Sequence, residues 1–170
     1  MKKYQLLLIV ILAFAVGYGF RYVQSPTNNG KGQHKKVTGI GGIFFKCSNR
    51  DSLMKWYNKN LGMNMEEYGC NFAWRHYDDS TQKGFTLWAP FGNKTKYFNP
   101  STKDFMMNYR VENLEWLLGE LKKEGIVPID KIDSTSYGNF VHIMDLEGNK
   151  IELWQPDDKD YEKNLKVLTY

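Results

Sequence analysis

A chain of 170 residues with 42% hydrophobic and 15% aromatic residues is long enough to bury one substantial core, and this composition excludes general disorder. Its formal net charge is +4, but six of its 23 basic residues fall in residues 1–36, which contain no acid. Residues 37–170 therefore carry 17 basic (23 − 6) and 19 acidic side chains, a net charge of −2. Without an excess of basic residues this domain is not expected to bind nucleic acid.

Residues 1–23 have the features of a signal peptide or membrane anchor. Two lysines precede a charge-free run of 17 residues, from 4 to 20, which is at the short end for a membrane-spanning helix. Ala13-Phe14-Ala15 resembles a cleavage site, whereas Phe20 followed by Arg21 suits an uncleaved anchor. Residues 24–36 read as a flexible polar linker. We expect the protein to be exported or membrane-anchored, with an extracytoplasmic domain and a membrane contact through this segment.

The rest of the chain contains an internal repeat. The stretch GFTLWAP at residues 84–90 returns as KIELWQP at residues 150–156, which aligns Thr86 with Glu152 and Trp88 with Trp154 at an offset of 66. A helical pattern at residues 53–63 returns at residues 116–126, at an offset of 63. Two landmarks in the same order predict two copies of one module, about residues 37–92 and 104–156, with a site where the copies face each other.

Each module is predicted to be one strand, one helix and three further strands. Asn49 and Asn113 are suited to cap the two helices, and Gly62 and Gly125 to end them. Residues 145–149 read as the turn of the last hairpin. Residues 94–103 read as a solvated connector, and residues 157–170 as a charged tail with a short helix that covers one edge. The predicted strands are residues 39–47, 65–68, 70–76 and 84–88 in the first module and 105–111, 127–132, 139–144 and 150–154 in the second.

The hairpin sequence DLEGNKIEL at residues 145–153, together with the paired modules, resembles the glyoxalase / bleomycin-resistance / extradiol-dioxygenase superfamily, also called vicinal oxygen chelate (VOC). The resemblance covers about residues 37–156. It implies an α+β domain in which two βαβββ modules form one open, cup-shaped β-barrel around a cavity. It also implies a divalent metal in many members, held by four inward residues, and compatibility with a homodimer.

The metal ligands of the superfamily do not carry over to this sequence. Their four positions fall on Gly42, Thr86, Met106 and Glu152, of which only Glu152 is a usual ligand. A single carboxylate does not replace the hydration shell of a divalent ion. We therefore expect no metal and no other cofactor, and a weakly held divalent metal is the alternative.

Side-chain alternation along the strands predicts which residues face the cavity. If Glu152 faces inward, Trp154 does so too, and the repeat adds Thr86 and Trp88. The predicted ligand-binding residues form an aromatic box with a few polar groups: Trp88, Trp154, Arg110, Asn108, Thr86, Phe44, Lys46 and Met106. His142 lies three residues before the hairpin turn, on the strand expected to pair with that of Glu152. A His–carboxylate pair is able to move a proton, although a single His is often only structural.

Two functions of different class follow. The preferred one is a metal-independent binding protein that holds a small aromatic or apolar molecule between Trp88 and Trp154, oriented by Arg110, Asn108 and Glu152. Arg110 would then favour anionic ligands. The alternative is a lyase, isomerase or dioxygenase-like enzyme that uses Glu152 and His142 as base and acid. Cys47 and Cys70 either pair in an oxidising compartment or serve as small buried hydrophobic residues.

Overall fold

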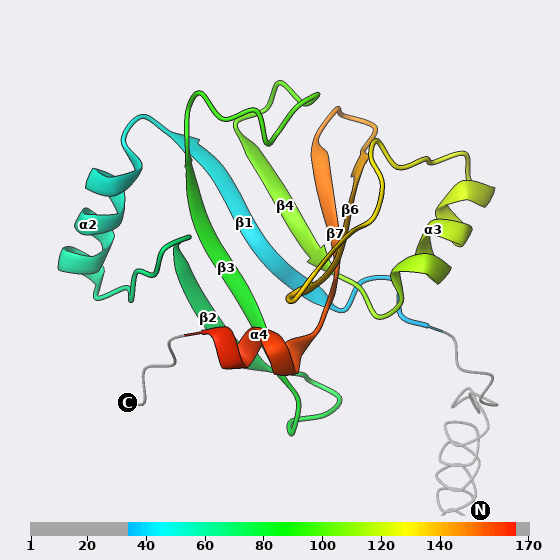
Figure 1. Ribbon diagram of the computed structural model, residues 1–170, viewed down its shortest axis with the longest axis horizontal. Helices are drawn as coiled ribbons and strands as arrows, with labels where there is room; N and C mark the ends of the chain where they lie inside the picture. The colour runs from blue at the N-terminus through cyan, green and yellow to red at the C-terminus, as the bar shows by residue number, and fades with distance from the viewer. Residues whose placement is uncertain (1–33, 166–170) are drawn as a thin grey trace, which may run out of the picture. The chain divides into compact units, whose positions relative to one another are not determined.

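The computed structural model describes residues 34–165, which fold around one mixed sheet of seven strands in the order β2-β3-β1-β4-β7-β6-β5 (Figure 1). The sheet is open and curled, and three helices accompany it, so the domain is α+β as predicted. The strands are β1 (Gly39–Cys47), β2 (Cys70–Arg75), β3 (Lys83–Gly92), β4 (Phe105–Arg110), β5 (Asp133–Thr135), β6 (Gly138–Met144) and β7 (Lys150–Pro156). The helices are α2 (Arg50–Leu61), α3 (Leu114–Lys123) and α4 (Asp158–Asn164).

The predicted signal or anchor segment and most of the linker, up to residue 33, lie outside the described residues. Within residues 34–165, no helix is both long enough and apolar enough to span a membrane.

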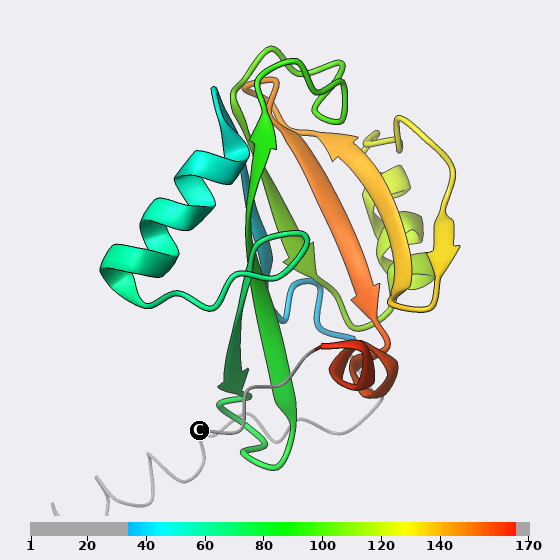
Figure 2. The ribbon, with the colours of Figure 1, turned by 60° about the vertical axis from the view of Figure 1, so that its left-hand side comes forward.

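The strand pairing relates the two modules to each other. The opening strands β1 and β4 pair with each other in antiparallel fashion at the centre of the sheet. On either side of this pair, β3 runs parallel to β1 and β7 runs parallel to β4. The last strand of each module thus lies beside its opening strand. The sheet is curved, and β2 and β6 flank these four central strands on either side (Figure 2).

The helix boundaries follow from local sequence. The side chains of Asn49 and Asn113 accept hydrogen bonds from the backbone N–H of Ser52 and Trp116, both at 2.9 Å, so both predicted N-caps are confirmed. Gly62 has φ = 66° directly after α2, a left-handed conformation that glycine adopts without a steric penalty. The last hairpin turn is also confirmed, because Asp145 Oδ1 accepts hydrogen bonds from the backbone N–H of Glu147 and Asn149.

The two helices of the repeat differ in how deeply they pack. Helix α3 places Leu114 and Leu117 against Val141, Ile143 and Leu153, which project from the outer face of β6 and β7. Helix α2 has no buried residue, and its tightest aromatic contact joins Tyr57 to the ring of Trp88 at 4.7 Å. The apolar side chains of α2 are therefore only partly covered: its tryptophan and its last leucine are more than half exposed.

Two predicted strands do not form. Residues 65–68 make a loop in which Glu66 N–H donates to the carbonyl of Gly69, a residue with φ = 148°. Residues 127–132 also lack strand structure, and β5 begins only at Asp133. Pro128 in that stretch has no N–H to donate to a ladder. The charged tail contains the expected short helix, α4, which crosses one end of the cup (Figures 1 and 2).

Candidate functional site

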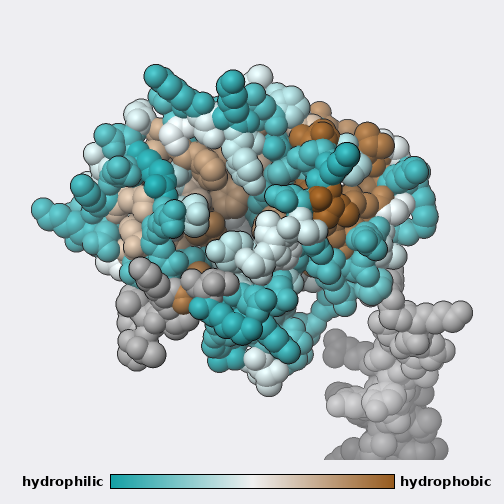
Figure 3. Space-filling model, viewed as in Figure 1, coloured by the Kyte–Doolittle hydropathy of each residue, from teal (hydrophilic) through white to brown (hydrophobic). Residues whose placement is uncertain are grey.

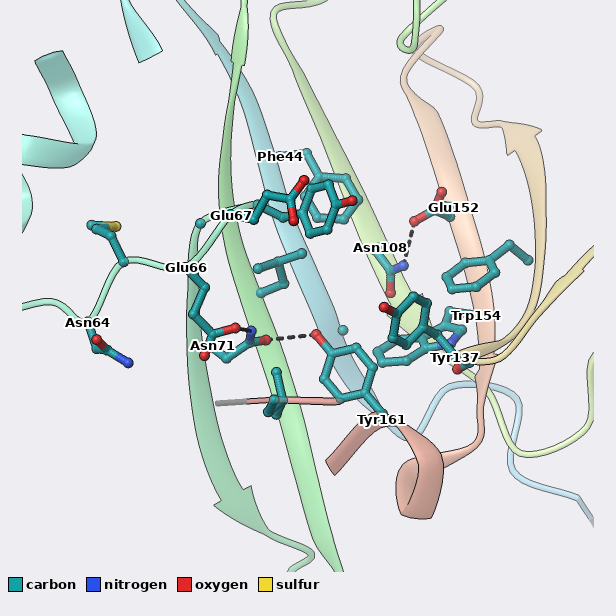
Figure 4. A pocket seen from close by; sticks show the side chains of 17 residues that line it. Phe44, Asn64, Glu66, Glu67, Asn71, Asn108, Tyr137, Glu152, Trp154 and Tyr161 are labelled. Atoms are coloured by element: carbon teal, nitrogen blue, oxygen red, sulfur yellow. Dashed lines mark hydrogen bonds between the residues drawn. The ribbon is translucent and has the colours of Figure 1, made fainter. Parts of the chain in front are cut away.

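The cup encloses a cavity of about 560 Å³ between the two modules. Figure 3 shows hydrophobic side chains gathered in a hollow between α2 and the central strands, framed by hydrophilic ones. Strands from both modules, the loop at residues 64–69 and helix α4 all contribute to the wall of the cavity (Figure 4). Its principal lining side chains are Phe44, Glu66, Glu67, Tyr68, Asn71, Leu87, Asn108, Tyr137, Phe140, Glu152, Trp154 and Tyr161.

Glu152 is the most constrained polar group of the cavity. It lies on the inner face of β7 and is 2% exposed. Its Oε1 accepts a hydrogen bond of 2.6 Å from Asn108 Nδ2 on the neighbouring strand, and its Oε2 accepts one from the hydroxyl of Tyr97. His142 Nε2 lies 2.9 Å from the same Oε2. Several donors therefore surround this buried carboxylate, as a buried charge requires.

His142 connects Glu152 to a second carboxylate. Its Nδ1 lies 2.6 Å from Asp130 Oδ2, and its backbone N–H donates to Asp130 Oδ1 at 2.9 Å. Both ring nitrogens thus face carboxylates, so either the imidazole carries two protons or one carboxyl group carries one. His142 and Asp130 line a neighbouring cavity of about 430 Å³, and the Asp130 side chain is 40% exposed. A chain of hydrogen-bonded groups thus leads from the buried Glu152 toward the surface.

Tyr97 comes from the connector between the modules, which was predicted to be solvated. Burial, reinforced by the negative charge of Glu152, raises the pKa of Tyr97 above its usual range, so that the phenol keeps its proton and donates it. Lys150 fixes the backbone here through a 2.7 Å hydrogen bond from Nζ to the Tyr97 carbonyl. Burial lowers the pKa of that lysine. Phe98, next along the connector, is fully buried against Phe44 and Met106.

Aromatic rings form the opposite part of the wall. Trp154 stacks on Phe140 with ring centroids 5.6 Å apart and donates from Nε1 to the carbonyl of Tyr137. Tyr161 of α4 packs on Trp154 at 5.1 Å, and its hydroxyl donates to Asn71 Oδ1 at 2.7 Å. Burial raises the pKa of Tyr161 to about 12. The hydrogen bond holds α4 to β2 across the cavity (Figure 4).

The structure places three of the eight predicted binding residues on the cavity wall, Phe44, Asn108 and Trp154, together with the candidate catalytic residue Glu152. The predicted inward orientation of Trp88 and Thr86 is wrong. The ring of Trp88 lies 5.1 Å from that of Phe45, on the side of the sheet that carries α2. Thr86 Oγ1 instead donates to the carbonyl of Ile40 and accepts from Trp74 Nε1.

The error at Thr86 and Trp88 is one residue of register. On β3 the cavity is lined by Leu87, which pairs with Gly42, whereas on β7 it is lined by Glu152, which pairs with Asn108. The spacing from Leu87 to Glu152 is 65 residues, an odd number, but the repeat aligns like residue types at an even offset of 66. Because side chains alternate along a strand, a shift of one residue reverses every side chain.

Three further predicted binding residues do not line the cavity. Met106 is 0% exposed and packs in a core cluster with Phe44, Ala89 and Phe98. Lys46 pairs with Asp104 at 3.2 Å and lies over the Phe98 ring. The guanidinium of Arg110, 1% exposed, lies over the rings of Trp154 and Trp74, and its Nη2 donates to Asp158 of α4 at 2.5 Å. Arg110 therefore does not line the cavity as predicted, because its guanidinium is engaged by Asp158 and the two tryptophans.

Several charged and hydrogen-bonding residues of the site that were not predicted come from segments outside the regular strands. Tyr97 belongs to a connector, Asp130 to a predicted strand that does not form, and Glu66 and Glu67 to another. One sequence signal was present for the first, since Tyr97-Phe98 places two large aromatic residues inside an otherwise polar stretch. Asp130 and the two glutamates carried no such signal.

The residues at the metal positions do not fit a divalent ion. Gly42 has no side chain, Met106 is in the core, and the Thr86 hydroxyl is engaged by Ile40 and Trp74. The Glu152 carboxylate is occupied by its hydrogen-bond donors. Among residues 34–165, no group of three or more His, Cys, Asp or Glu side chains is arranged to hold a metal.

The two cysteines do not form a disulfide. Cys70 is buried and Cys47 is partly buried, and both are free. Burial raises the pKa of the Cys70 thiol.

The chain shares its fold with solved methylmalonyl-CoA epimerases, which agrees with the predicted resemblance to the VOC superfamily. Methylmalonyl-CoA epimerase from Mycobacterium tuberculosis matches with 16% identity and a TM-score of 0.50, over 75% of this chain and 94% of that one. A Streptomyces coelicolor methylmalonyl-CoA epimerase variant in complex with 2-nitronate-propionyl-CoA matches with 13% identity and a TM-score of 0.54, over 71% and 99%. A methylmalonyl-CoA epimerase in complex with methylmalonyl-CoA and NH4+ has the same identity and TM-score, over 71% and 96%.

These identities are low, so the likeness establishes the fold and leaves the activity open. No protein-family model matches the sequence, and no curated protein matches it.

Proposed function

We propose that this protein binds a small molecule with an apolar or aromatic body in the cavity between its modules, without a metal. The observation that carries the proposal is the cavity of about 560 Å³, whose wall includes six aromatic residues and a few fixed polar groups. Cavities of this size and composition are typical small-molecule sites. Aromatic side chains supply contact area, and Asn108 with Glu152 supplies orientation.

Two features support binding without a metal. The superfamily's metal positions offer one carboxylate, and that carboxylate is already held by Asn108, Tyr97 and His142. A metal would have to displace these donors and would still lack further ligands.

The test is calorimetric titration of the full-length chain with tert-butylbenzene, a neutral compound with an aromatic ring and a compact apolar group. We expect saturable binding that is the same before and after treatment with EDTA. Trp154→Ala should weaken it by about fivefold, because stacking on an aromatic ring is worth about 1 kcal/mol beyond burial. Trp88→Ala is the matched control, since that ring lies under α2 and should leave the affinity unchanged. Absence of saturable binding, or binding that EDTA removes, would contradict the proposal.

A second function, proton transfer by an enzyme, is favoured by one specific observation. His142 bridges Glu152 at the cavity and Asp130 near the surface. A proton that Glu152 takes from a bound molecule would have a hydrogen-bonded route through His142 and Asp130 to solvent. Solved proteins of this fold include epimerases crystallised with methylmalonyl-CoA and with 2-nitronate-propionyl-CoA. This function makes the protein an isomerase or lyase in which Glu152 is the base and His142 the acid.

Exchange of the α-proton of methylmalonyl-CoA in deuterium oxide, followed by NMR, tests the second function. Exchange that survives EDTA and is lost in Glu152→Gln would establish it, because an amide cannot accept the proton. No exchange, with tert-butylbenzene still bound, would leave binding as the function.

A further inference from the structure

The charged side chains on the cavity wall all have one sign. They are Glu66 and Glu67 from the loop before β2 and Glu152 from β7. Among the described residues that line this cavity, none is a Lys, Arg or His. In an enclosed space with apolar walls, such charges are less screened than on an open surface.

The three carboxylates have different surroundings. Glu152 is buried at the back of the cavity, where Asn108, Tyr97 and His142 already contact its carboxylate, so a preference for positive charge does not depend on it. Glu66 receives one long hydrogen bond, 3.5 Å from Asn71 Nδ2. Within residues 34–165, the Glu67 carboxylate has no hydrogen-bond or ion-pair partner, and Figure 4 shows it beside Phe44, at the edge of the cavity.

Two arginines close to the cavity are already engaged elsewhere. Arg110 lies behind the ring of Trp154 and is paired with Asp158. Arg50 donates to two backbone carbonyls, those of Pro90 and Glu67. Neither guanidinium pairs with a carboxylate of the cavity wall, and among residues 34–165 neither Glu66 nor Glu67 has an ion-pair partner.

The aromatic rings of the cavity wall also favour a positively charged ligand. Tyr137 and Tyr161 meet almost at a right angle, with centroids 5.8 Å apart and an interplanar angle of 76°, and Tyr161 lies against Trp154 at 5.1 Å. Rings set at an angle present π faces and edges to the same space. The face of an aromatic ring carries negative potential and attracts a cation.

A buried acceptor without a partner also points to a ligand. Asn108 is 2% exposed and lines the cavity. Its Nδ2 donates to Glu152, and its Oδ1 has no hydrogen-bond partner within the described part of the chain. A buried acceptor without a hydrogen-bond partner destabilises the fold, and a donor group on a ligand would remove this penalty.

From these observations we infer that the cavity selects an organic cation with an apolar body, such as an aromatic or alkyl ammonium compound. The inference rests on the proposed function and names the class of its ligand. The cation would lie among the rings of Tyr137, Tyr161 and Trp154, opposite Glu66 and Glu67. The same wall disfavours anionic ligands, including phosphorylated thioesters such as the coenzyme A esters bound by proteins of similar fold.

Three probes of equal shape and different charge test this inference on the full-length chain. They are trimethylphenylammonium, tert-butylbenzene and benzenesulfonate, each with a tetrahedral group on one phenyl ring and with positive, zero and negative charge. We expect the cation to bind about tenfold more tightly than the neutral compound, and the anion to bind most weakly. Added salt should weaken binding of the cation and leave that of the neutral compound unchanged.

Variants that remove a negative charge test whether the glutamates of the cavity wall cause the preference for the cation. Glu66→Gln and Glu67→Gln should each reduce the affinity for trimethylphenylammonium severalfold and leave tert-butylbenzene unaffected. Glu147→Gln, which makes the same change on the exposed hairpin turn, is the matched control. If tert-butylbenzene binds as well as the cation, or benzenesulfonate binds best, the inference is wrong and the proposed function stands. If none of the three probes binds, both fail.

Discussion

At the scale of single residues, the site depends on how one buried carboxylate is satisfied. Glu152 sits on the inner face of β7, and it is retained there by donors from three different segments: Asn108 from β4, Tyr97 from the connector and His142 from β6. Since an unpaired buried charge is strongly unfavourable, these donors and the carboxylate stabilise one another. Loss of any one donor should therefore lower the free energy of unfolding.

Tyr97→Phe removes the hydroxyl that donates to Glu152 and keeps the ring. Because hydrogen bonds to charged groups contribute more than neutral ones, we expect the free energy of unfolding to fall by about 2 kcal/mol, measured by urea denaturation. Tyr77→Phe is the matched control: this residue is fully exposed and should show no change. Equal stability of Tyr97→Phe and the unsubstituted chain would mean that Tyr97 does not hold Glu152.

The buried tyrosines predict how stability depends on alkaline pH. Burial raises the pKa of Tyr97 above its usual range and that of Tyr161 from 10.0 to about 12. Above pH 10.0 the unfolded chain loses these protons before the folded chain does. Their contribution is thus fully present below that pH and is lost as pH rises through the folded pKa. Urea denaturation from pH 8 to pH 11, as a rough window around the ordinary tyrosine pKa, should show this fall, and Tyr97→Phe with Tyr161→Phe should flatten it.

At the scale of elements, the close approach of β1 to the cavity wall requires glycine at residue 41. A Cβ there would lie 2.1 Å from Asn108 Oδ1 and 2.7 Å from Cε3 of Trp154. Gly119, on the exposed side of α3, has nothing within 4 Å of a Cβ. We expect Gly41→Ala to destabilise the fold by about 2 kcal/mol through overpacking, and Gly119→Ala to stabilise it by about 0.5 to 1 kcal/mol through helix propensity. Thermal denaturation of both variants checks this, and a harmless Gly41→Ala would contradict the described contact.

Helix α4 is attached to the cup by an ion pair with a buried partner. Asp158→Ala would leave the guanidinium of Arg110 buried between two tryptophans without a counter-ion. We expect a loss of about 2 to 3 kcal/mol, below the value for a fully buried pair because Asp158 is 36% exposed. Lys163→Ala breaks an exposed pair with Asp160 on the same helix and should change stability far less than Asp158→Ala. Similar losses in the two variants, measured by urea denaturation, would mean that Arg110 does not anchor α4.

At the scale of the whole molecule, the sequence predicts features that depend on local chemistry. Asn49 and Asn113 cap helices through their own side chains, and the turn after Asp145 is likewise local. Glu152 predicts which side chains of β7 face inward, because side chains alternate between the two faces of a strand and this charged residue fixes the alternation. The inner face of β3 is not predicted, since Leu87 and Trp88 are both apolar and only the pairing with β1 separates them.

Residues from irregular segments enter the site through tertiary contacts that no local pattern encodes. Glu67 and Asp130 lie in stretches whose residues suit strands, and the contacts with Arg50 and His142 place them as they are. The membrane contact of residues 1–23 and the homodimer stay predictions, as does the absence of a nucleic-acid partner.

The central claim, that a ligand binds inside the cup, is tested most directly by the indole N–H signals of the tryptophans in an NMR titration with trimethylphenylammonium. Three of these indoles report on different places: Trp154 lines the cavity, Trp88 lies under α2, and Trp116 is on α3. We predict a saturable shift of the Trp154 indole signal, with those of Trp88 and Trp116 unmoved. A shift largest at Trp88 or Trp116, or no saturable shift at Trp154, would contradict the claim.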